Sequence, residues 1–173
     1  IHKLIRPKSD KPEKTRPIPK KADWWCESFN EKGAFRGYDY DMTAYCKWLT
    51  ENYSIFRYTK SSGAREIVQS NHGVLSIISR DTLHDLLKPY FEQHPETLHT
   101  DIILNSTKKR EFFDPNYGLT GIPEITESKR TFNFKTRETE YLFFQNCIVS
   151  IKANETTLLN YEDFNGLIWD DQV

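Results

Sequence analysis

Two short motifs in the chain carry side chains that could perform chemistry. Asp39-Tyr40-Asp41 places two carboxylates one residue apart, and Ser70-Asn71-His72 adds a hydroxyl and an imidazole. On a β-strand, residues i and i+2 lie on the same face, so Asp39 and Asp41 would suit the metal ions of a two-metal phosphoryl transfer. The two motifs together define one catalytic hypothesis.

A structural interpretation competes for the same residues. Asp41 stands directly before an apolar pattern of helical spacing, which is where an Asp side chain caps a helix. Asn71-His72-Gly73 has the composition of a tight turn. A metal-dependent primase or polymerase core would also need a third acid on a later strand, and the later acids fall in expected helices or loops. These acids are Asp101, Asp114 and Asp163. We favour the structural interpretation and keep the catalytic one as an alternative.

Signatures of other enzyme and cofactor classes are missing from the sequence. None of the seven glycines precedes Lys-Ser or Lys-Thr, so the chain has no phosphate-cradling loop for ATP. The three cysteines, Cys26, Cys46 and Cys147, are widely spaced and contain no C-x-x-C, which predicts reduced, buried thiols rather than disulfides or a zinc site. We therefore expect no cofactor and no catalysis in this part of the protein.

Charge divides the chain into two parts. The segment 1–22 holds eight Lys or Arg, two acids and four of the eight prolines, whereas the whole chain has 24 basic and 25 acidic residues. Such a Pro/Lys-rich segment cannot bury enough apolar surface to offset its ordering entropy, so we interpret 1–22 as a basic linker or tail. Residues 23–173 form the expected single domain, which has a length and a 14% aromatic content sufficient for a core.

Turn residues and apolar spacing predict an α+β fold in which β-hairpins forming an antiparallel sheet pack with two or three helices. Helix caps and a helix-breaking proline give further boundaries. The expected N-terminal elements are a hairpin of Trp24–Phe29 and Ala34–Tyr38, a helix from Asp41 to about Asn52, a hairpin of Ser54–Thr59 and Glu66–Ser70, and a strand at Val74–Ile78. The expected C-terminal elements are a helix capped by Asp81 and kinked or split at Pro89, a helix over Thr97–Phe112 with Leu98, Ile102, Ile103 and Phe112 inward, a loop at Leu119–Thr131, strands at Tyr141–Ile151, Thr157–Tyr161 and Tyr161–Trp169, and a turn at Ala153–Glu155.

Several basic residues are candidates for nucleic-acid contact, because cations replace counterions on phosphates and nearby aromatic rings stack on bases. Ordinary solvation of a half-exposed sheet, and a helix C-terminus that favours cations, explain the same residues without a ligand. The candidates are Arg36, Arg57, Lys60 and Arg65 beside Tyr38 and Tyr58 on the expected hairpins, and Lys108, Lys109 and Arg110 at the end of an expected helix.

Three stretches carry a resemblance to a known family. They are Ser54–Tyr58 with the later Thr82–Leu87, the run Thr139–Val149 with its aromatic pair and Asn146, and the closing Gly166–Val173 with Trp169 and Gln172. Over about residues 24–173 the chain resembles the segment that precedes the ATPase domain in primase-helicases of bacteriophages and mobile elements, which are related to poxvirus-type primase-helicases. Cys147 stands where that family usually has Gly.

This resemblance implies a non-catalytic accessory domain of a DNA-replication protein that precedes a superfamily 3 type helicase motor. It implies as partners the protein's own C-terminal helicase domain, sister subunits of a homo-oligomer, and single-stranded or forked DNA. The catalytic alternative resembles archaeo-eukaryotic primases, which use an Asp-x-Asp pair for metal and a Ser-x-His motif for the nucleotide phosphates. This resemblance implies that Asp39 and Asp41 would hold the metal and that His72 would contact the phosphates. A protein-interaction domain that never contacts nucleic acid is the third hypothesis.

The sequence also gives expectations about location and extent. No run of 18 apolar residues is present, and Lys3 and Arg6 lead into prolines rather than into the apolar centre of a signal peptide. We therefore expect a cytoplasmic protein in a bacterial host, with no membrane contact. Position 1 is not Met, and Val173 follows Trp169 almost at once, so we expect further sequence on both sides.

Overall fold

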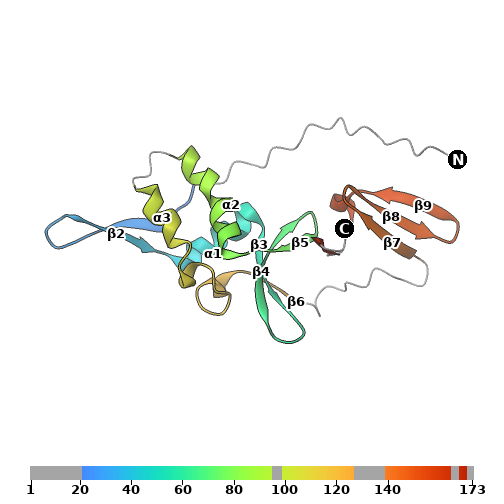
Figure 1. Ribbon diagram of the computed structural model, residues 1–173, viewed down its shortest axis with the longest axis horizontal. Helices are drawn as coiled ribbons and strands as arrows, with labels where there is room; N and C mark the ends of the chain where they lie inside the picture. The colour runs from blue at the N-terminus through green and yellow to red at the C-terminus, as the bar shows by residue number, and fades with distance from the viewer. Residues whose placement is uncertain (1–20, 95–98, 127–138, 165–167, 171–173) are drawn as a thin grey trace.

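The computed structural model describes residues 21–94, 99–126, 139–164 and 168–170. Within these ranges it contains three α-helices and three separate sheets, which confirms the α+β class (Figure 1). The expected linker at 1–22 lies almost entirely outside the described residues. None of the described helices has the length and apolar character needed to cross a membrane.

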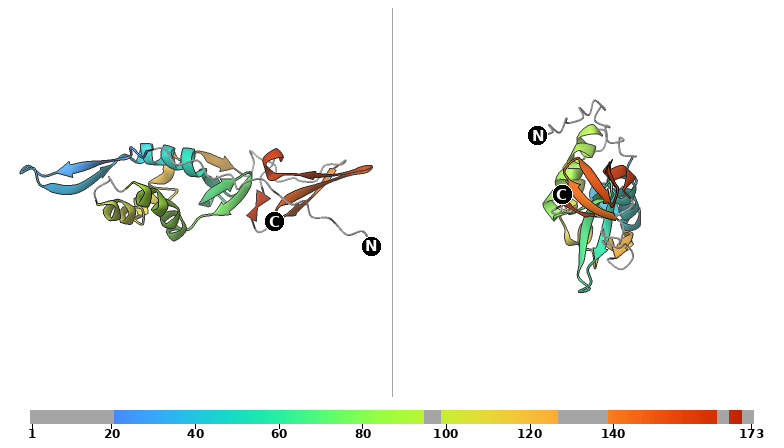
Figure 2. Two further views of the ribbon diagram at one scale, coloured as in Figure 1. Left: turned by 90° about the horizontal axis from the view of Figure 1, so that it is seen from above. Right: turned by 90° about the vertical axis from the view of Figure 1, so that its right-hand side faces the viewer.

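The first sheet is a two-stranded antiparallel ribbon of β1 (Trp25–Phe29) and β2 (Phe35–Tyr40). Its turn forms because the Asn30 side-chain oxygen accepts hydrogen bonds from the backbone N–H groups of Lys32 and Ala34. Gly33 follows with φ of +75°, a conformation that glycine adopts without a Cβ penalty. The predicted hairpin is thus confirmed, and Figure 2 shows it extending away from the helices.

Helix α1 (Met42–Tyr53) begins where the sequence predicted. Asp41 has extended backbone, and its carboxylate accepts hydrogen bonds from the N–H groups of Thr43 and Ala44 at 2.9 and 3.0 Å. The buried stripe of the helix contains Tyr45, Trp48 and Leu49. The helix packs against the main core through this stripe, and its opposite side remains exposed.

The central sheet has five strands in the order β10-β5-β4-β3-β6. The strands β3 (Ile55–Thr59), β4 (Arg65–Asn71) and β5 (Val74–Ile77) form the predicted antiparallel part. Two parallel additions complete it: β6 (Glu124–Thr126) beside β3, and β10 (Ile168–Trp169) beside β5.

Two expectations about this sheet are wrong. The segment 119–131 is not all loop, because its described part contains the short 3₁₀ helix η2 (Leu119–Gly121) and then β6. The segment 161–169 is not one strand, because its described part is η3 (Tyr161–Asp163) followed by β10. In each case the strand forms by pairing with a partner that is distant in sequence. A local sequence pattern does not indicate such pairing.

Helix α2 (Arg80–Gln93) has its N-cap two positions earlier than predicted. Ser79, rather than Asp81, is the N-cap, and its hydroxyl accepts a hydrogen bond from the Thr82 N–H at 3.0 Å. Pro89 does not split the helix. Pro89 and Asp85, four residues before it, are both exposed, so water can donate to the carbonyl that loses its intrahelical donor.

Helix α3 (Thr100–Ser106) is shorter than the predicted helix over 97–112. Thr97 and Leu98 lie outside the described residues. Ile103 is buried as expected, but Ile102 is exposed. The helix ends before Lys108, and the 3₁₀ helix η1 (Arg110–Phe112) follows, which buries Phe112.

Aromatic side chains dominate the main core. Trp24 is fully buried just before β1, and its ring centroid lies 4.6 Å from that of Tyr45 and 6.1 Å from that of Phe112. A second cluster on the central sheet contains Tyr58, with Trp169 of β10 at 4.9 Å in an edge-to-face arrangement. These contacts attach α1 and β10 to the body of the molecule.

The third sheet comprises β7 (Thr139–Phe144), β8 (Cys147–Lys152) and β9 (Glu155–Leu159), all antiparallel. The apolar run predicted as one strand over 141–151 is instead a hairpin that turns at Gln145–Asn146. The predicted turn near Asn154 is confirmed. Figure 1 shows this sheet at the opposite end of the molecule from β2.

Candidate nucleic-acid interface

Arg57 on β3 is an internal anchor of the central sheet. Its side chain is only 13% exposed, and its Nη2 lies 3.2 Å from Oε2 of Glu124 on β6. Its Nη1 also donates to the carbonyl oxygens of Pro115 and Thr120 at 3.4 and 3.3 Å. Both terminal nitrogens of Arg57 are therefore directed at protein acceptors, whereas its buried Nε has no hydrogen-bond partner in the described part of the chain.

Glu124 is held by two partners at once. Besides Arg57, the Thr59 hydroxyl donates a hydrogen bond to its Oε1. The Thr59 hydrogen bond, followed by the charge of Arg57, holds the pKa of Glu124 below its ordinary value, although partial burial opposes the shift. Glu124 is therefore ionised at neutral pH, where its charge balances that of Arg57.

The β3–β4 turn presents two further predicted cations. Lys60 pairs with Glu66 at 2.8 Å, so its charge is partly compensated. Arg65 is exposed, and its Nη1 donates to the side-chain oxygen of Asn116 at 3.0 Å. The residues between them, 61–64, are small and exposed. The bond between Arg65 and Asn116 joins the hairpin to the loop that follows η1.

The segment Lys108–Arg110 reaches the same loop from the other side. The Arg110 Nε donates to Oδ2 of Asp114 at 2.7 Å, and the Arg110 guanidinium carbon lies 5.6 Å from the centre of the Tyr117 ring. The hydrogen bond from Arg110 holds the pKa of Asp114 below its ordinary value. Lys108 and Lys109 are exposed, and no ion pair involves them within the described ranges.

The structure thus brings together predicted cations that are far apart in the sequence. Arg65 of β4 and Arg110 of η1 both contact the loop 114–118, so the two elements border the same loop. We name this surface the basic loop surface. Its members are Lys60, Arg65, Lys108, Lys109, Arg110, Asn116 and Tyr117.

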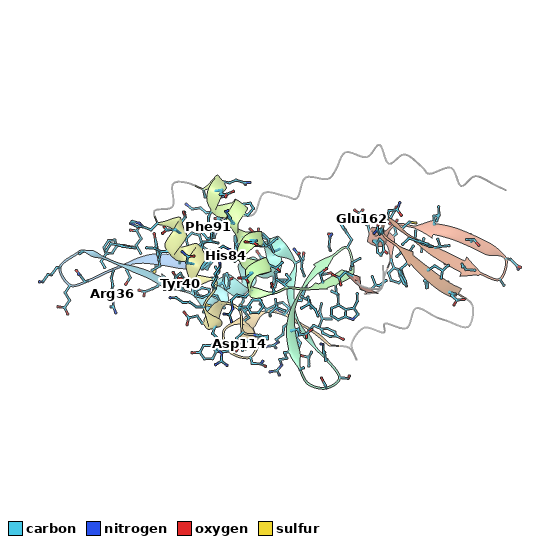
Figure 3. All side chains as sticks on the ribbon, in the orientation of Figure 1. Arg36, Tyr40, His84, Phe91, Asp114 and Glu162 are labelled. Carbon is cyan, nitrogen blue, oxygen red and sulfur yellow. The ribbon has the colours of Figure 1, made fainter. Side chains whose placement is uncertain are left out.

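Arg36 does not belong to this surface. It is exposed on β2, and Figure 3 shows it on the projecting ribbon, away from Asp114. The same ribbon carries Glu27, Glu31 and Asp39. Arg36 thus shares the ribbon with the exposed Lys32 and with these acids, and it is not part of the basic loop surface.

The structure does not assemble the predicted catalytic residues into one site. The Asp41 carboxylate caps α1, and His72 lies in the β4–β5 turn with φ of +51°, where its Nδ1 is 3.7 Å from Oε1 of Glu162. Figure 3 shows Glu162 well apart from Tyr40 along the long axis of the molecule, and Tyr40 stands between the two Asp residues in the sequence. His72 is therefore far from the carboxylates that it would have to assist.

No cluster of three or more His, Cys, Asp or Glu side chains suited to a metal is found in the part of the chain that the structure describes. The three thiols are free, but only Cys46 is fully buried, where burial raises its pKa. Cys26 is exposed on β1, so the prediction of a buried thiol is wrong there.

Sequence reasoning missed the residues that organise the basic loop surface. Asp114, Asn116 and Tyr117 occur in Asp-Pro-Asn-Tyr-Gly, a turn-forming composition whose Asp114 Oδ1 accepts from the Asn116 N–H at 2.8 Å. That composition could have indicated an ordered turn displaying an aromatic ring. The bond between Arg65 and Asn116 could not have been found, because the two residues are distant in sequence.

Comparisons of the chain with protein-family models, with curated proteins and with solved structures find no match. The functional assignment therefore rests on the residues of this chain.

Proposed function

We propose that this chain is a non-catalytic accessory domain of a phage or mobile-element DNA-replication primase-helicase, and that it contacts DNA through the basic loop surface. One observation carries the proposal: cations from the β3–β4 hairpin and from the segment Lys108–Arg110 converge on one ordered loop with an exposed aromatic ring. Phosphate-binding cations beside an aromatic face are the combination that engages nucleic acid.

The net charge of −1 makes this a local contact rather than a general affinity for polyanions. The carboxylates near the surface, Glu66 and Asp114, are each paired with a cation. Lys108 and Lys109 remain for phosphate. A domain of this kind would guide a strand toward a motor supplied by another part of the protein, in the cytoplasm of a bacterial host.

The test is binding to fluorescent single-stranded and forked DNA over a salt series. Lys108→Ala with Lys109→Ala should weaken binding and reduce the slope of log K against log salt by about 2, because each phosphate contact contributes close to one unit. The matched control is Lys47→Ala with Lys88→Ala, which removes the same charge from exposed lysines that pair with Glu51 and Glu92. Equal effects of the two double variants would reject the basic loop surface as the interface.

Mg²⁺ and nucleotides provide a second comparison in the same assay. Binding that does not depend on them supports the accessory role. Nucleotide incorporation that requires Mg²⁺ and disappears in Asp39→Asn would instead support the primase alternative.

A second candidate function is self-association, which would assemble sister subunits. It is favoured by the third sheet, where Leu142, Val149 and Leu158 lie directly opposite one another on three strands, with both leucines exposed. Phe144 is also exposed at the end of β7. Because this row carries no charge, the same row on a second copy is complementary to it.

Light scattering over a concentration series tests this candidate. Leu142→Ser with Leu158→Ser should shift the protein toward the monomer, whereas Thr156→Ser, an exposed change on the same strand as Leu158, should not. A wild-type protein that stays monomeric at all concentrations would remove the self-association candidate.

A further inference from the structure

Tyr117 is unusual among the aromatic residues of the central body. Its side chain is 64% exposed, whereas Trp24, Tyr45, Tyr58 and Phe112 are buried. A single exposed apolar residue needs no explanation by itself. What distinguishes Tyr117 is that the protein holds its loop in place through several side chains.

Four hydrogen bonds help to hold the loop. Asp114 receives the Arg110 Nε through Oδ2 and the Asn116 N–H through Oδ1. The Asn116 side-chain oxygen in turn accepts from Arg65 on β4. The Tyr117 N–H donates to the Asp114 carbonyl at 3.2 Å. The loop that carries the ring is thus attached to both η1 and the central sheet in the absence of any ligand.

Gly118 makes this loop path available. A Cβ at position 118 would lie 1.5 Å from the carbonyl oxygen of Glu111, so any side chain there would displace backbone. The close approach of the chain to Glu111 directs the loop back against η1. Loop and aromatic ring are consequently preorganised, which lowers the entropic cost of binding.

The surroundings of the ring are cationic. The Arg110 guanidinium lies over the ring at 5.6 Å, and it is 75% exposed, so it also faces solvent. Arg65 contacts Asn116, the residue before Tyr117, and Lys108 and Lys109 directly precede Arg110 in the chain. A flat ring beside an exposed guanidinium offers a face for stacking and a charge for the adjoining phosphate.

We propose that Tyr117 and Arg110 form a stacking site for one base of single-stranded nucleic acid. The inference rests on the proposed function and goes beyond it by naming the strand form and the residues that read it. In a duplex each base face is covered by its neighbours, so Tyr117 can stack only on an unpaired base. The stacking is independent of base identity, because every base has a π-face.

The experiment compares oligothymidylate, oligouridylate and a blunt DNA duplex as fluorescent probes. Tyr117→Ala should weaken binding of both single strands by about fivefold to a hundredfold, the range for loss of one base stack. Duplex binding should change by less than about twofold, because its contacts are with phosphates. Tyr117→Phe should retain single-strand affinity, since the ring remains. The salt slope should be unchanged in Tyr117→Ala and smaller in Arg110→Ala.

Two controls sharpen the result. Phe29→Ala removes another exposed aromatic ring, located on β1, and should leave both affinities unchanged. An oligothymidylate analogue made entirely of abasic sites keeps the phosphates and lacks the bases. Wild type and Tyr117→Ala should bind this analogue equally.

The outcomes separate this inference from the function beneath it. Wild type that binds no nucleic acid would overturn the proposed function. Wild type that binds, with Tyr117→Ala weakening single strand and duplex equally or neither, would overturn the stacking site alone. A difference between the two proteins on the abasic analogue would likewise overturn stacking and assign Tyr117 to the backbone.

Discussion

Arg57 and Glu124 form an ion pair across the parallel β3–β6 junction, with 3.2 Å between Nη2 and Oε2 although the residues are 67 positions apart. Strand β6 has only three residues, so its ladder contributes few hydrogen bonds. The pair and the Thr59 hydroxyl supplement them. The edge of the central sheet is therefore attached by side chains as well as by backbone.

Glu124→Gln should make stability less dependent on pH. The pKa of Glu124 is depressed below its ordinary value of 4.5, so its charge stabilises the fold above about pH 4.5 and this contribution is lost as the pH falls through the folded-state pKa. Thermal melts should show a lower Tm for the variant at neutral pH, and the difference should shrink below pH 4.5. A difference that persists unchanged at lower pH would show that charge is not the cause.

Tyr45→Phe should stabilise the protein by about 1 kcal/mol. The Tyr45 hydroxyl is buried and has no hydrogen-bond partner in the described part of the chain, and an unsatisfied buried hydroxyl carries a desolvation cost of about 1–3 kcal/mol. Urea denaturation measures the change. The matched variant Tyr90→Phe should have the opposite sign, because the Tyr90 oxygen accepts from the Ala22 N–H at 2.6 Å. Equal signs would contradict the structure.

Asp41→Ala should cost about 1 kcal/mol of unfolding free energy, the usual consequence of losing an N-cap. Asp39→Ala, two residues earlier and exposed, should stay within about 0.5 kcal/mol of wild type. If instead both substitutions abolished a Mg²⁺-dependent activity while stability was unchanged, the role of Asp41 as a cap would be secondary. Circular dichroism and urea titration give the free energies.

Ile168→Ala should destabilise the protein by about 2–5 kcal/mol, because Ile168 on β10 is fully buried. The control is Ile77→Ala on the neighbouring β5, where the side chain is 56% exposed and the cost should be well under 1 kcal/mol. A small effect of Ile168→Ala would mean that β10 contributes little to the central sheet.

Local signals in the sequence predicted the N-terminal half of the fold well. Gly33 and Gly63 mark turns that both adopt positive φ, and Asp41 caps the helix whose apolar stripe follows it. Such features depend on neighbouring residues only. They are therefore visible in any short window of sequence.

Strand β6 and the bounds and partner of β10 were missed because the partners are remote. Glu124 pairs in register with Arg57, and Ile168 with Val74. Strand β10 lies inside the strand predicted over 161–169, but it occupies only the end of that segment. The site shows the same limit. Arg65 and Arg110 were predicted separately, but only the tertiary fold places both on the loop that contains Asn116 and Asp114.

The pairing of β10 with β5 also has a consequence for the order in which the chain folds. The antiparallel strands β3, β4 and β5 are joined by short turns, so their contacts form quickly. Ile168, by contrast, pairs with Val74 across a stretch of chain that contains helices α2 and α3 and the whole third sheet. During synthesis on the ribosome, the outer edge of β5 remains open until residue 169 has emerged. Until then the edge of β5 at Val74 and Leu75 lacks the strand that pairs with it in the folded protein.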